Sequence, residues 1–181
     1  MVLVDRDGTI DRCEAGDYIL SPDRFELLPG AAEGLRLLRE AGLRLAVVTN
    51  QAAIGRGWID PPTLDAIHAR MTQLLSAEGV DGIEGIYVCP HRPEDACGCR
   101  KPAPGLAVRA AGELGFELSR AFVVGDRAAD VELGRRVGAT TILVRTGQHA
   151  GDRFEEPAHH EAADLAEAAA IIAGLVGEES A

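Results

Sequence analysis

The sequence lacks an excess of positive charge, and this shortage limits the partners that it can bind. Its 181 residues hold 18 Lys and Arg against 29 Asp and Glu, a formal net charge of -11. Because an acidic surface repels phosphate backbones, we expect no nucleic-acid partner. A few local cations can still dominate one cleft, so a small phosphorylated substrate stays compatible with this composition.

Long apolar runs are also missing. No uninterrupted apolar stretch is long enough to cross a bilayer, so we expect no membrane contact. The first residues show no basic segment followed by a long apolar one, so a secretory signal is not expected and the predicted location is the cytoplasm.

Short β-rich runs alternate with helical patterns, and no internal repeat or linker interrupts them. This alternation predicts one α/β domain over residues 1–181, with a mostly parallel, Rossmann-like sheet and helices on both faces. The spans between strands hold single helices and loops, so no cap domain is expected. The predicted strands are 2–4, 43–48, 86–88, 121–124 and 140–144, and the predicted helices are 32–41, 63–78, 106–114 and the segment from 126 to Gly138.

The pattern weakens after Gly147. We expect a loop over 149–160 and a terminal helix over 162–176. His68 is predicted to lie at the surface or edge of its helix. Ligands of open α/β sheets bind outside the carboxyl ends of the strands, so the polar residues that follow each strand are expected to converge.

Two carboxylates, Asp5 and Asp7, follow the first strand one residue apart. Side by side they repel, so a cation is expected with them, and hard oxygen ligands suit Mg²⁺. One carboxylate could attack phosphorus and the other could transfer protons. The alternative is an ordinary Asp-Gly turn at Gly8.

Other strand ends supply further polar groups. Thr49 and Asn50 could donate to phosphoryl oxygens or simply cap a strand. Asp126 could complete the set of Mg²⁺ ligands. Asp130 could contact these ligands without binding the ion itself, or it could be an acidic residue of the first helical turn that the helix dipole favours.

Cysteine is scarce, but three of the four cysteines lie together with a histidine. The spacing C-x-H-x5-C-x-C, over Cys89, His91, Cys97 and Cys99, suits tetrahedral Zn²⁺, and four protein ligands leave no open position. We therefore predict a structural zinc loop over 89–99, with a redox role or coincidence as the alternative. The loop would deliver Arg100 and Lys101 in a fixed place, and Cys13 is interpreted as a simple thiol.

These segments together resemble the haloacid dehalogenase (HAD) phosphatase superfamily. The resemblance rests on Asp5-x-Asp7-Gly8-Thr9, Thr49-Asn50, Lys101 and Gly125-Asp126, in that order. It implies Asp5 as nucleophile and Asp7 as general acid and base, with Lys101 and Thr49 holding the phosphoryl group. It also implies Mg²⁺ on Asp5, the Asp7 backbone carbonyl and Asp126.

The zinc loop is similar to that of the branch that holds heptose bisphosphate and histidinol-phosphate phosphatases. The stretch 49–59, TNQAAIGRGWI, resembles the heptose enzymes, although Ala52-Ala53 and Arg127 depart from their usual pattern. Gly16-Asp17-Tyr18 resembles their substrate loop. The substrate-binding residues implied are Tyr18, Asn50, Gln51, Arg56, Arg100, Lys101 and Arg127.

The resemblance therefore implies a Mg²⁺-dependent phosphatase that removes the 7-phosphate of D-glycero-D-manno-heptose 1,7-bisphosphate. The partner expected is this small sugar phosphate, and a monomer is the default expectation. The alternatives are a histidinol-phosphate phosphatase and a catalytically silent scaffold that uses the zinc loop for contacts.

Overall fold

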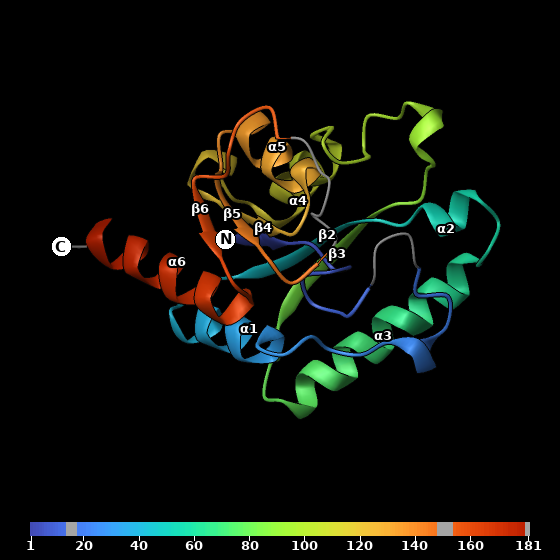
Figure 1. The fold of residues 1–181 in the computed structure, drawn as a ribbon, viewed down its shortest axis with the longest axis horizontal. Coiled ribbons are helices and arrows are strands. Elements are labelled where there is room, and N and C mark those ends of the chain that lie inside the picture. The colour runs from blue at the N-terminus through green and yellow to red at the C-terminus, as the bar shows by residue number, and fades with distance from the viewer. Residues whose placement is uncertain (14–17, 148–153, 180–181) are drawn as a thin grey trace.

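The centre of the protein is a parallel sheet, seen in a computed structural model that describes residues 1–13, 18–147 and 154–179. The six-stranded sheet has the order β3-β2-β1-β4-β5-β6 (Figure 1). Its strands are β1 (Val2–Val4), β2 (Leu45–Asn50), β3 (Ile83–Cys89), β4 (Phe122–Gly125), β5 (Thr140–Val144) and β6 (His160–Ala162).

Helices cover both faces of this sheet, as the alternating pattern predicted (Figure 1). α4 and α5 lie on one face, and α1, α3 and α6 lie on the other. The helices are α1 (Ala31–Glu40), α2 (Ala52–Gly55), α3 (Pro61–Ala77), α4 (Gly105–Leu114), α5 (Ala128–Arg136) and α6 (Leu165–Glu179). Single turns of 3₁₀ helix cover Pro22–Arg24, Pro93–Asp95 and Leu118–Arg120.

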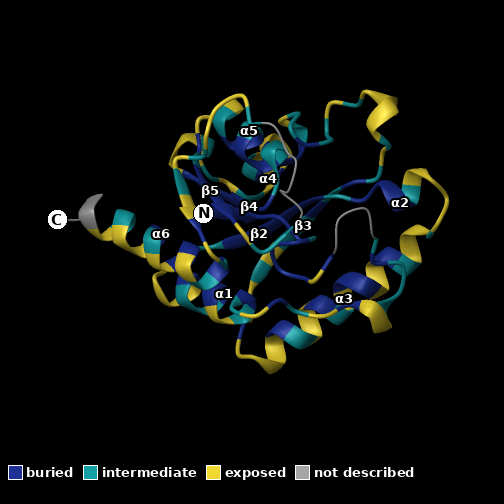
Figure 2. Ribbon diagram, viewed as in Figure 1, coloured by how far each residue is buried: buried dark blue, intermediate teal, exposed yellow. Residues whose placement is uncertain are grey.

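Alternate residues of the central strand serve the two halves of the core. Val2 and Val4 pack into the cluster that includes Leu35 of α1 and Met71 of α3. Leu3 packs into the opposite cluster, with Leu106 of α4. Because successive side chains of a strand point to opposite faces, a continuous apolar run such as 2–4 is what a strand covered on both faces requires. Figure 2 shows the central strands as buried.

The strand register places the polar residues of several strands at one edge. Val4 is paired with Val47 of β2 and with Val124 of β4. Asp5, the residue that follows β1, therefore lies near the carboxyl ends of both neighbouring strands. The backbone amide of Asp5 donates to the carbonyl of Val124 at 2.9 Å. This edge of the sheet carries the candidate site.

Two strands extend further than the sequence pattern predicted. β2 runs to Asn50 because Thr49 and Asn50 pair with Val88 and Cys89 of β3. The last polar residues of β2 and the first zinc-loop cysteine are therefore strand residues, held by ladder hydrogen bonds rather than by a flexible loop.

The prediction of a loop up to residue 160 was wrong at its end. Within the expected loop, 148–153 lie outside the described residues, and β6 begins at His160 and pairs with β5, Leu143 beside Glu161. Only Ala162 of its three residues is buried, so no period-two pattern marks the strand in the sequence. α6 then begins at Leu165. No helix among the described residues is both long and apolar enough to cross a membrane.

Candidate active site

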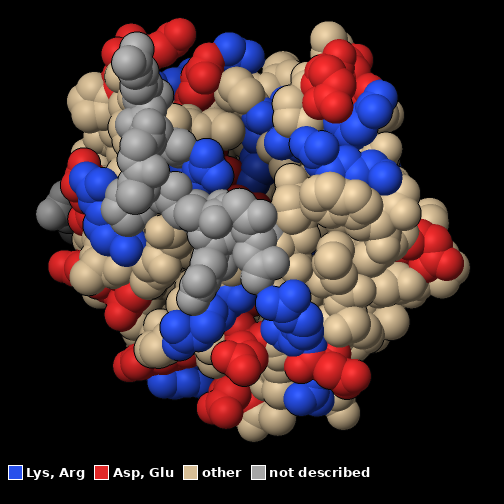
Figure 3. All heavy atoms as spheres, turned by 45° about the vertical axis from the view of Figure 1, so that its right-hand side comes forward, with Lys and Arg blue, Asp and Glu red and all other residues tan. Residues whose placement is uncertain are grey.

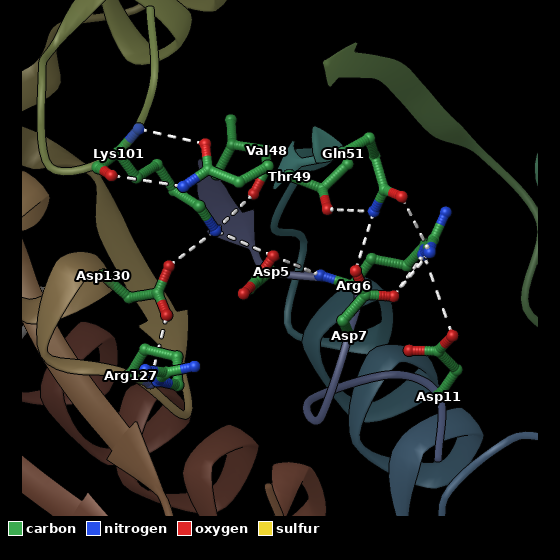
Figure 4. A network of polar contacts seen from close by, with 11 residues as sticks. Asp5, Arg6, Asp7, Asp11, Val48, Thr49, Gln51, Lys101, Arg127 and Asp130 are labelled. Carbon is green, nitrogen blue, oxygen red and sulfur yellow. Dashed lines mark hydrogen bonds and ion pairs between the residues drawn. The ribbon is translucent and has the colours of Figure 1, made fainter. Parts of the chain in front are cut away.

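Lys101 lies at the centre of the candidate site and is almost completely buried, with 4% of its surface exposed. Its Nζ contacts Oδ1 of Asp5 at 2.7 Å and Oδ1 of Asp130 at 2.6 Å, and it donates to the carbonyl of Val48 at 2.8 Å (Figure 4). Three acceptors for three ammonium hydrogens fix the position of the charge.

The charges in this centre depend on one another. Burial alone would lower the pKa of Lys101, but the carboxylates of Asp130 and Asp5 outweigh it and raise this pKa. Burial, followed by repulsion from Asp130, raises the pKa of Asp5 well above its ordinary value. A site that gathers several buried carboxylates around one ammonium therefore favours a further cation.

The carboxylates offer a place for that cation. Oxygens of Asp5, Asp126 and Asp130 all lie within 4.8 Å of one another, and all three residues are buried. Asp130 is already engaged, because its Oδ2 accepts from the backbone amide of Arg127 at 3.1 Å while Oδ1 holds Lys101. Asp5 and Asp126 are thus the side chains best placed as ligands, and hard carboxylate oxygens are the donors that Mg²⁺ requires.

Glycines keep the space beside Asp126 open. A Cβ atom at Gly8 would lie 2.5 Å from Oδ2 of Asp126, and one at Gly147 would lie 2.1 Å from it. Gly125 likewise makes room for Asp130, whose Cγ would lie 2.3 Å from an added Cβ. The donor set and this glycine-lined space both fit a bound Mg²⁺.

Asp7 points to a different part of the site from Asp5. Its Oδ2 accepts from Nε2 of Gln51 at 2.7 Å, and its Oδ1 accepts from Nε of Arg6 at 2.9 Å. The same Gln51 Nε2 donates to Oγ1 of Thr49 at 2.9 Å. The Asp7 side chain keeps 23% of its surface exposed, so it can meet a substrate, and the Asp7 carboxylate lies outside the cluster of Asp5, Asp126 and Asp130.

The side chain of Asn50 binds the backbone of Lys101. Its Oδ1 accepts from the backbone amide of Lys101 at 3.0 Å, and its Nδ2 donates to the Lys101 carbonyl at 3.1 Å. We predicted substrate contact from Asn50, and that stays a prediction; the structure shows that its amide also holds the Lys101 backbone through these two bonds. This pair of bonds joins the end of β2 to the end of the zinc loop.

The zinc loop brings its four candidate ligands together. Nδ1 of His91 lies 3.6 Å from Sγ of Cys89 and 3.2 Å from Sγ of Cys99, and the sulfur atoms of Cys89, Cys97 and Cys99 lie 3.2 to 3.6 Å apart. A tetrahedral zinc with sulfur about 2.3 Å away separates its ligands by about 3.5–3.8 Å, so the cluster could bind zinc. Cys13 is buried and does not belong to the cluster.

Cations border the site. Arg100 is half-buried and donates to the carbonyl of His91 at 3.2 Å, whereas Arg127 is the N-cap residue that precedes α5, and its backbone amide donates to Asp130. Figure 3 shows a recess on this side of the molecule with basic atoms on its walls and acidic atoms deep inside it. The excess of negative charge in the whole chain thus does not extend to the rim of the recess.

The exposed Arg56 lies against Trp58, which in turn packs against Tyr18. Its guanidinium carbon lies 5.2 Å from the ring centre of Trp58, and the Trp58 and Tyr18 rings meet edge to face at 5.0 Å. Trp58 is 52% exposed. Gly16 and Asp17, the rest of the predicted substrate loop, lie outside the described residues.

Sequence reasoning missed Arg6 and misplaced His68. Arg6 has no exposed surface although it stands between two acidic residues. His68 was predicted to be a surface or edge residue, but it is buried, with 8% of its surface exposed. The two meet, Arg6 Nη1 lying 3.1 Å from His68 Nε2. The burial of Arg6 could have been predicted, because three successive charged residues directly after a buried strand require internal pairing.

Asp11 completes the charged group around Arg6. Its Oδ2 lies 3.7 Å from Nε of Arg6, and neither carboxylate oxygen has a hydrogen-bond partner among the described residues. Burial, followed by repulsion from Asp7, raises the pKa of Asp11 to about 8. Asp7 is the closer carboxyl partner of Arg6, since its contact with Nε is 2.9 Å long and that of Asp11 is 3.7 Å long.

Comparison with known proteins places these features in a family. The family described as HAD-hydrolase-like matches residues 98–168. The D-glycero-beta-D-manno-heptose-1,7-bisphosphate 7-phosphatase of Pseudomonas aeruginosa is 40% identical over 149 residues, which cover 82% of each chain. The D-glycero-alpha-D-manno-heptose-1,7-bisphosphate 7-phosphatase of Mycobacterium tuberculosis is 41% identical over 139 residues, or 76% of this chain and 73% of that one.

A solved structure extends the likeness to the whole fold. The crystal structure of D,D-heptose 1,7-bisphosphate phosphatase from Bordetella bronchiseptica, complexed with magnesium and phosphate, superposes with a TM-score of 0.87. It is 32% identical and covers 98% of both chains. The fold class predicted from the sequence is confirmed.

Proposed function

The chain belongs to the HAD-like hydrolases, beside the heptose bisphosphate 7-phosphatases, and on that premise we propose that it removes the 7-phosphate of a D-glycero-D-manno-heptose 1,7-bisphosphate. It is a phosphoric monoester hydrolase. The observation that carries the proposal is the contact of buried Lys101 with Asp5, at the edge of the sheet where Asp126 also lies.

Asp5 is the proposed nucleophile. Its Oδ1 accepts from the backbone amide of Arg6 at 2.7 Å and contacts Lys101, which fixes the plane of the carboxylate and leaves Oδ2 to attack phosphorus. The bond from phosphorus to the sugar oxygen breaks as Asp7 gives that oxygen a proton, and an aspartyl-phosphate remains.

Hydrolysis of the aspartyl-phosphate completes the cycle. Asp7, now a carboxylate, takes a proton from water as the water oxygen attacks phosphorus, and inorganic phosphate leaves with the Asp5 carboxylate restored. Lys101 and the Thr49 hydroxyl hold the phosphoryl oxygens. Mg²⁺ bound by Asp5, Asp126 and the Asp7 carbonyl would reduce the repulsion between nucleophile and phosphate.

Specificity is proposed to come from the cations and aromatic residues of the rim. Arg56, Arg100 and Arg127 are candidates for the 1-phosphate, which is not hydrolysed, and Tyr18 for the sugar. A guanidinium suits this role because it binds phosphate oxygens in pairs. Zn²⁺ in the cluster of Cys89, His91, Cys97 and Cys99 would have a structural role, since the loop continues directly into Arg100 and Lys101. We propose a monomer that acts in the cytoplasm.

Phosphate release from a panel of esters tests this function. The purified protein with Mg²⁺ is given both anomers of the heptose bisphosphate, fructose 1,6-bisphosphate and histidinol phosphate. We expect the largest kcat/KM with one heptose anomer. Preference for histidinol phosphate would reject the substrate and keep the chemistry. Equal inactivity of the wild type and Asp5→Asn towards every ester would instead support the scaffold alternative.

A further inference from the structure

Arg6 is a large charged side chain with no exposed surface, placed between the two aspartates of the proposed mechanism. Its contacts lead to Asp7 rather than to Asp5. Both Nε and Nη2 of Arg6 donate to Oδ1 of Asp7, the first at 2.9 Å. The distance from Nε to Oδ2 of Asp11 is longer, at 3.7 Å. A guanidinium that binds one carboxylate through two nitrogens fixes its direction as well as its charge.

Gln51 closes the other side of the same carboxylate. Its Nε2 donates to Oδ2 of Asp7 at 2.7 Å, and its Oε1 accepts from Nη2 of Arg6 at 3.2 Å. Each oxygen of Asp7 thus has a donor, and the two residues that supply these donors bind each other. Figure 4 shows Asp7 enclosed by Arg6 and Gln51, on the side away from Lys101.

His68 supports Arg6 from α3. A guanidinium offers hydrogen-bond donors and no acceptor, so the ring nitrogen 3.1 Å from Nη1 has to be the accepting nitrogen of a neutral imidazole. His68 comes 62 residues after Arg6 in the chain, and α3 lies on the face of the sheet opposite α4 and α5 (Figure 1). The orientation of Asp7 is therefore tied to the packing of a whole helix.

We propose that Arg6 is a positioning residue for proton transfer by Asp7, with Gln51 and His68 fixing it, and this inference rests on the proposed function. When the ester bond breaks, the Asp7 proton moves to the sugar oxygen and a carboxylate is left beside Arg6. A guanidinium placed there before the reaction stabilises that developing charge without having to move. The benefit is greatest for a poor leaving group such as an alkoxide, which cannot depart without a proton.

The dependence of the rate on the leaving group tests this role. The kcat/KM of the heptose bisphosphate, whose alkoxide requires protonation, is compared with the kcat/KM of p-nitrophenyl phosphate, whose phenolate leaves without it. Because both substrates share the later hydrolysis of the aspartyl-phosphate, kcat/KM, which reports only the steps up to release of the leaving group, is the quantity compared. For Asp7→Asn we expect kcat/KM on the sugar phosphate to fall about 10²-fold or more and kcat/KM on the aryl ester to fall far less. Arg6→Lys should show the same selective loss, by about 10-fold or more, because one ammonium cannot replace the two-nitrogen contact.

A second pair of variants covers the case in which Arg6→Lys does not fold. His68→Leu removes the acceptor for Arg6 and should lower kcat/KM on the sugar phosphate severalfold while changing kcat/KM on the aryl ester far less. His68→Gln restores an acceptor and should recover most of the loss, a rescue that a purely structural role would not make selective for one substrate.

The results that would reject the role of Arg6 alone differ from those that would reject the phosphatase mechanism. If the Arg6 and His68 variants lose both activities by the same factor, or neither, while Asp7→Asn stays selective, the positioning role is wrong and the phosphatase mechanism stands. If the wild type hydrolyses no phosphate ester, or Asp7→Asn is not selective, proton transfer by Asp7 and the role of Arg6 are both overturned.

Discussion

Asp130→Asn is the substitution that most directly tests how Lys101 is held. The carboxylate is 2% exposed, and its two oxygens accept from Lys101 Nζ at 2.6 Å and from the Arg127 amide at 3.1 Å. An asparagine has the same shape but only one accepting oxygen, so either the ammonium or the start of α5 loses its partner.

The cost follows from these two bonds. A hydrogen bond to a charged group contributes roughly 1.5–3 kcal/mol and a helix cap roughly 1 kcal/mol. We expect the free energy of unfolding to fall by about 2–4 kcal/mol, which lowers Tm by roughly 5–15 °C for a chain of this length. Lys101 keeps Asp5 and the Val48 carbonyl as acceptors but can shift, so kcat should fall about 10- to 100-fold.

Thermal melting and phosphate release measure the two effects. Glu132→Gln, on the same helix, is the matched control, because its partner Arg136 is 48% exposed and such surface pairs contribute at most about 1 kcal/mol. The control should melt within a few degrees of wild type and turn over normally. An Asp130→Asn protein that matched the control in both measurements would refute the account of Lys101.

Three further outcomes are expected. Burial, followed by the charge of Arg6, lowers the pKa of His68 to about 4, so the stability that its neutral ring contributes is full above pH 6.5 and is lost as the pH falls towards 4. Between pH 7 and 5, denaturant titration should show the free energy of unfolding of the wild type falling by about 2 kcal/mol more than that of His68→Gln. An equal fall in the two proteins would contradict the pKa shift. Cys97→Ser should lower both zinc content and melting temperature, whereas Cys13→Ser should keep its zinc; equal zinc in both variants would remove Cys97 from the site. Gly147→Ala, whose Cβ would lie 2.1 Å from Oδ2 of Asp126, should raise the Mg²⁺ concentration for half-maximal activity about tenfold or more. The control Gly112→Ala, whose Cβ would have no atom within 4 Å, should leave it unchanged. An unchanged Mg²⁺ requirement in Gly147→Ala would place the ion elsewhere.

Much of the fold could be read from the sequence because apolar runs and helical stripes are local. The run Val2–Val4 and the stripe of α3 each follow from one short window of residues. β6 could not be predicted, since its three residues are ordered by backbone pairing with β5 and carry almost no apolar signal. The ends of β2 and β3 were missed for the same reason.

The sequence by itself determined which groups meet, because residues that follow parallel strands must share one edge of the sheet. That placed Asp5, Lys101 and Asp126 together and gathered the zinc ligands within one loop. Only the tertiary structure decided the partner of each group. The binding of Asn50 to the Lys101 backbone and the burial of Arg6 against His68 depend on contacts across 51 and 62 residues of chain. No local pattern records such contacts, because they are fixed by how helices and loops pack once the sheet has formed.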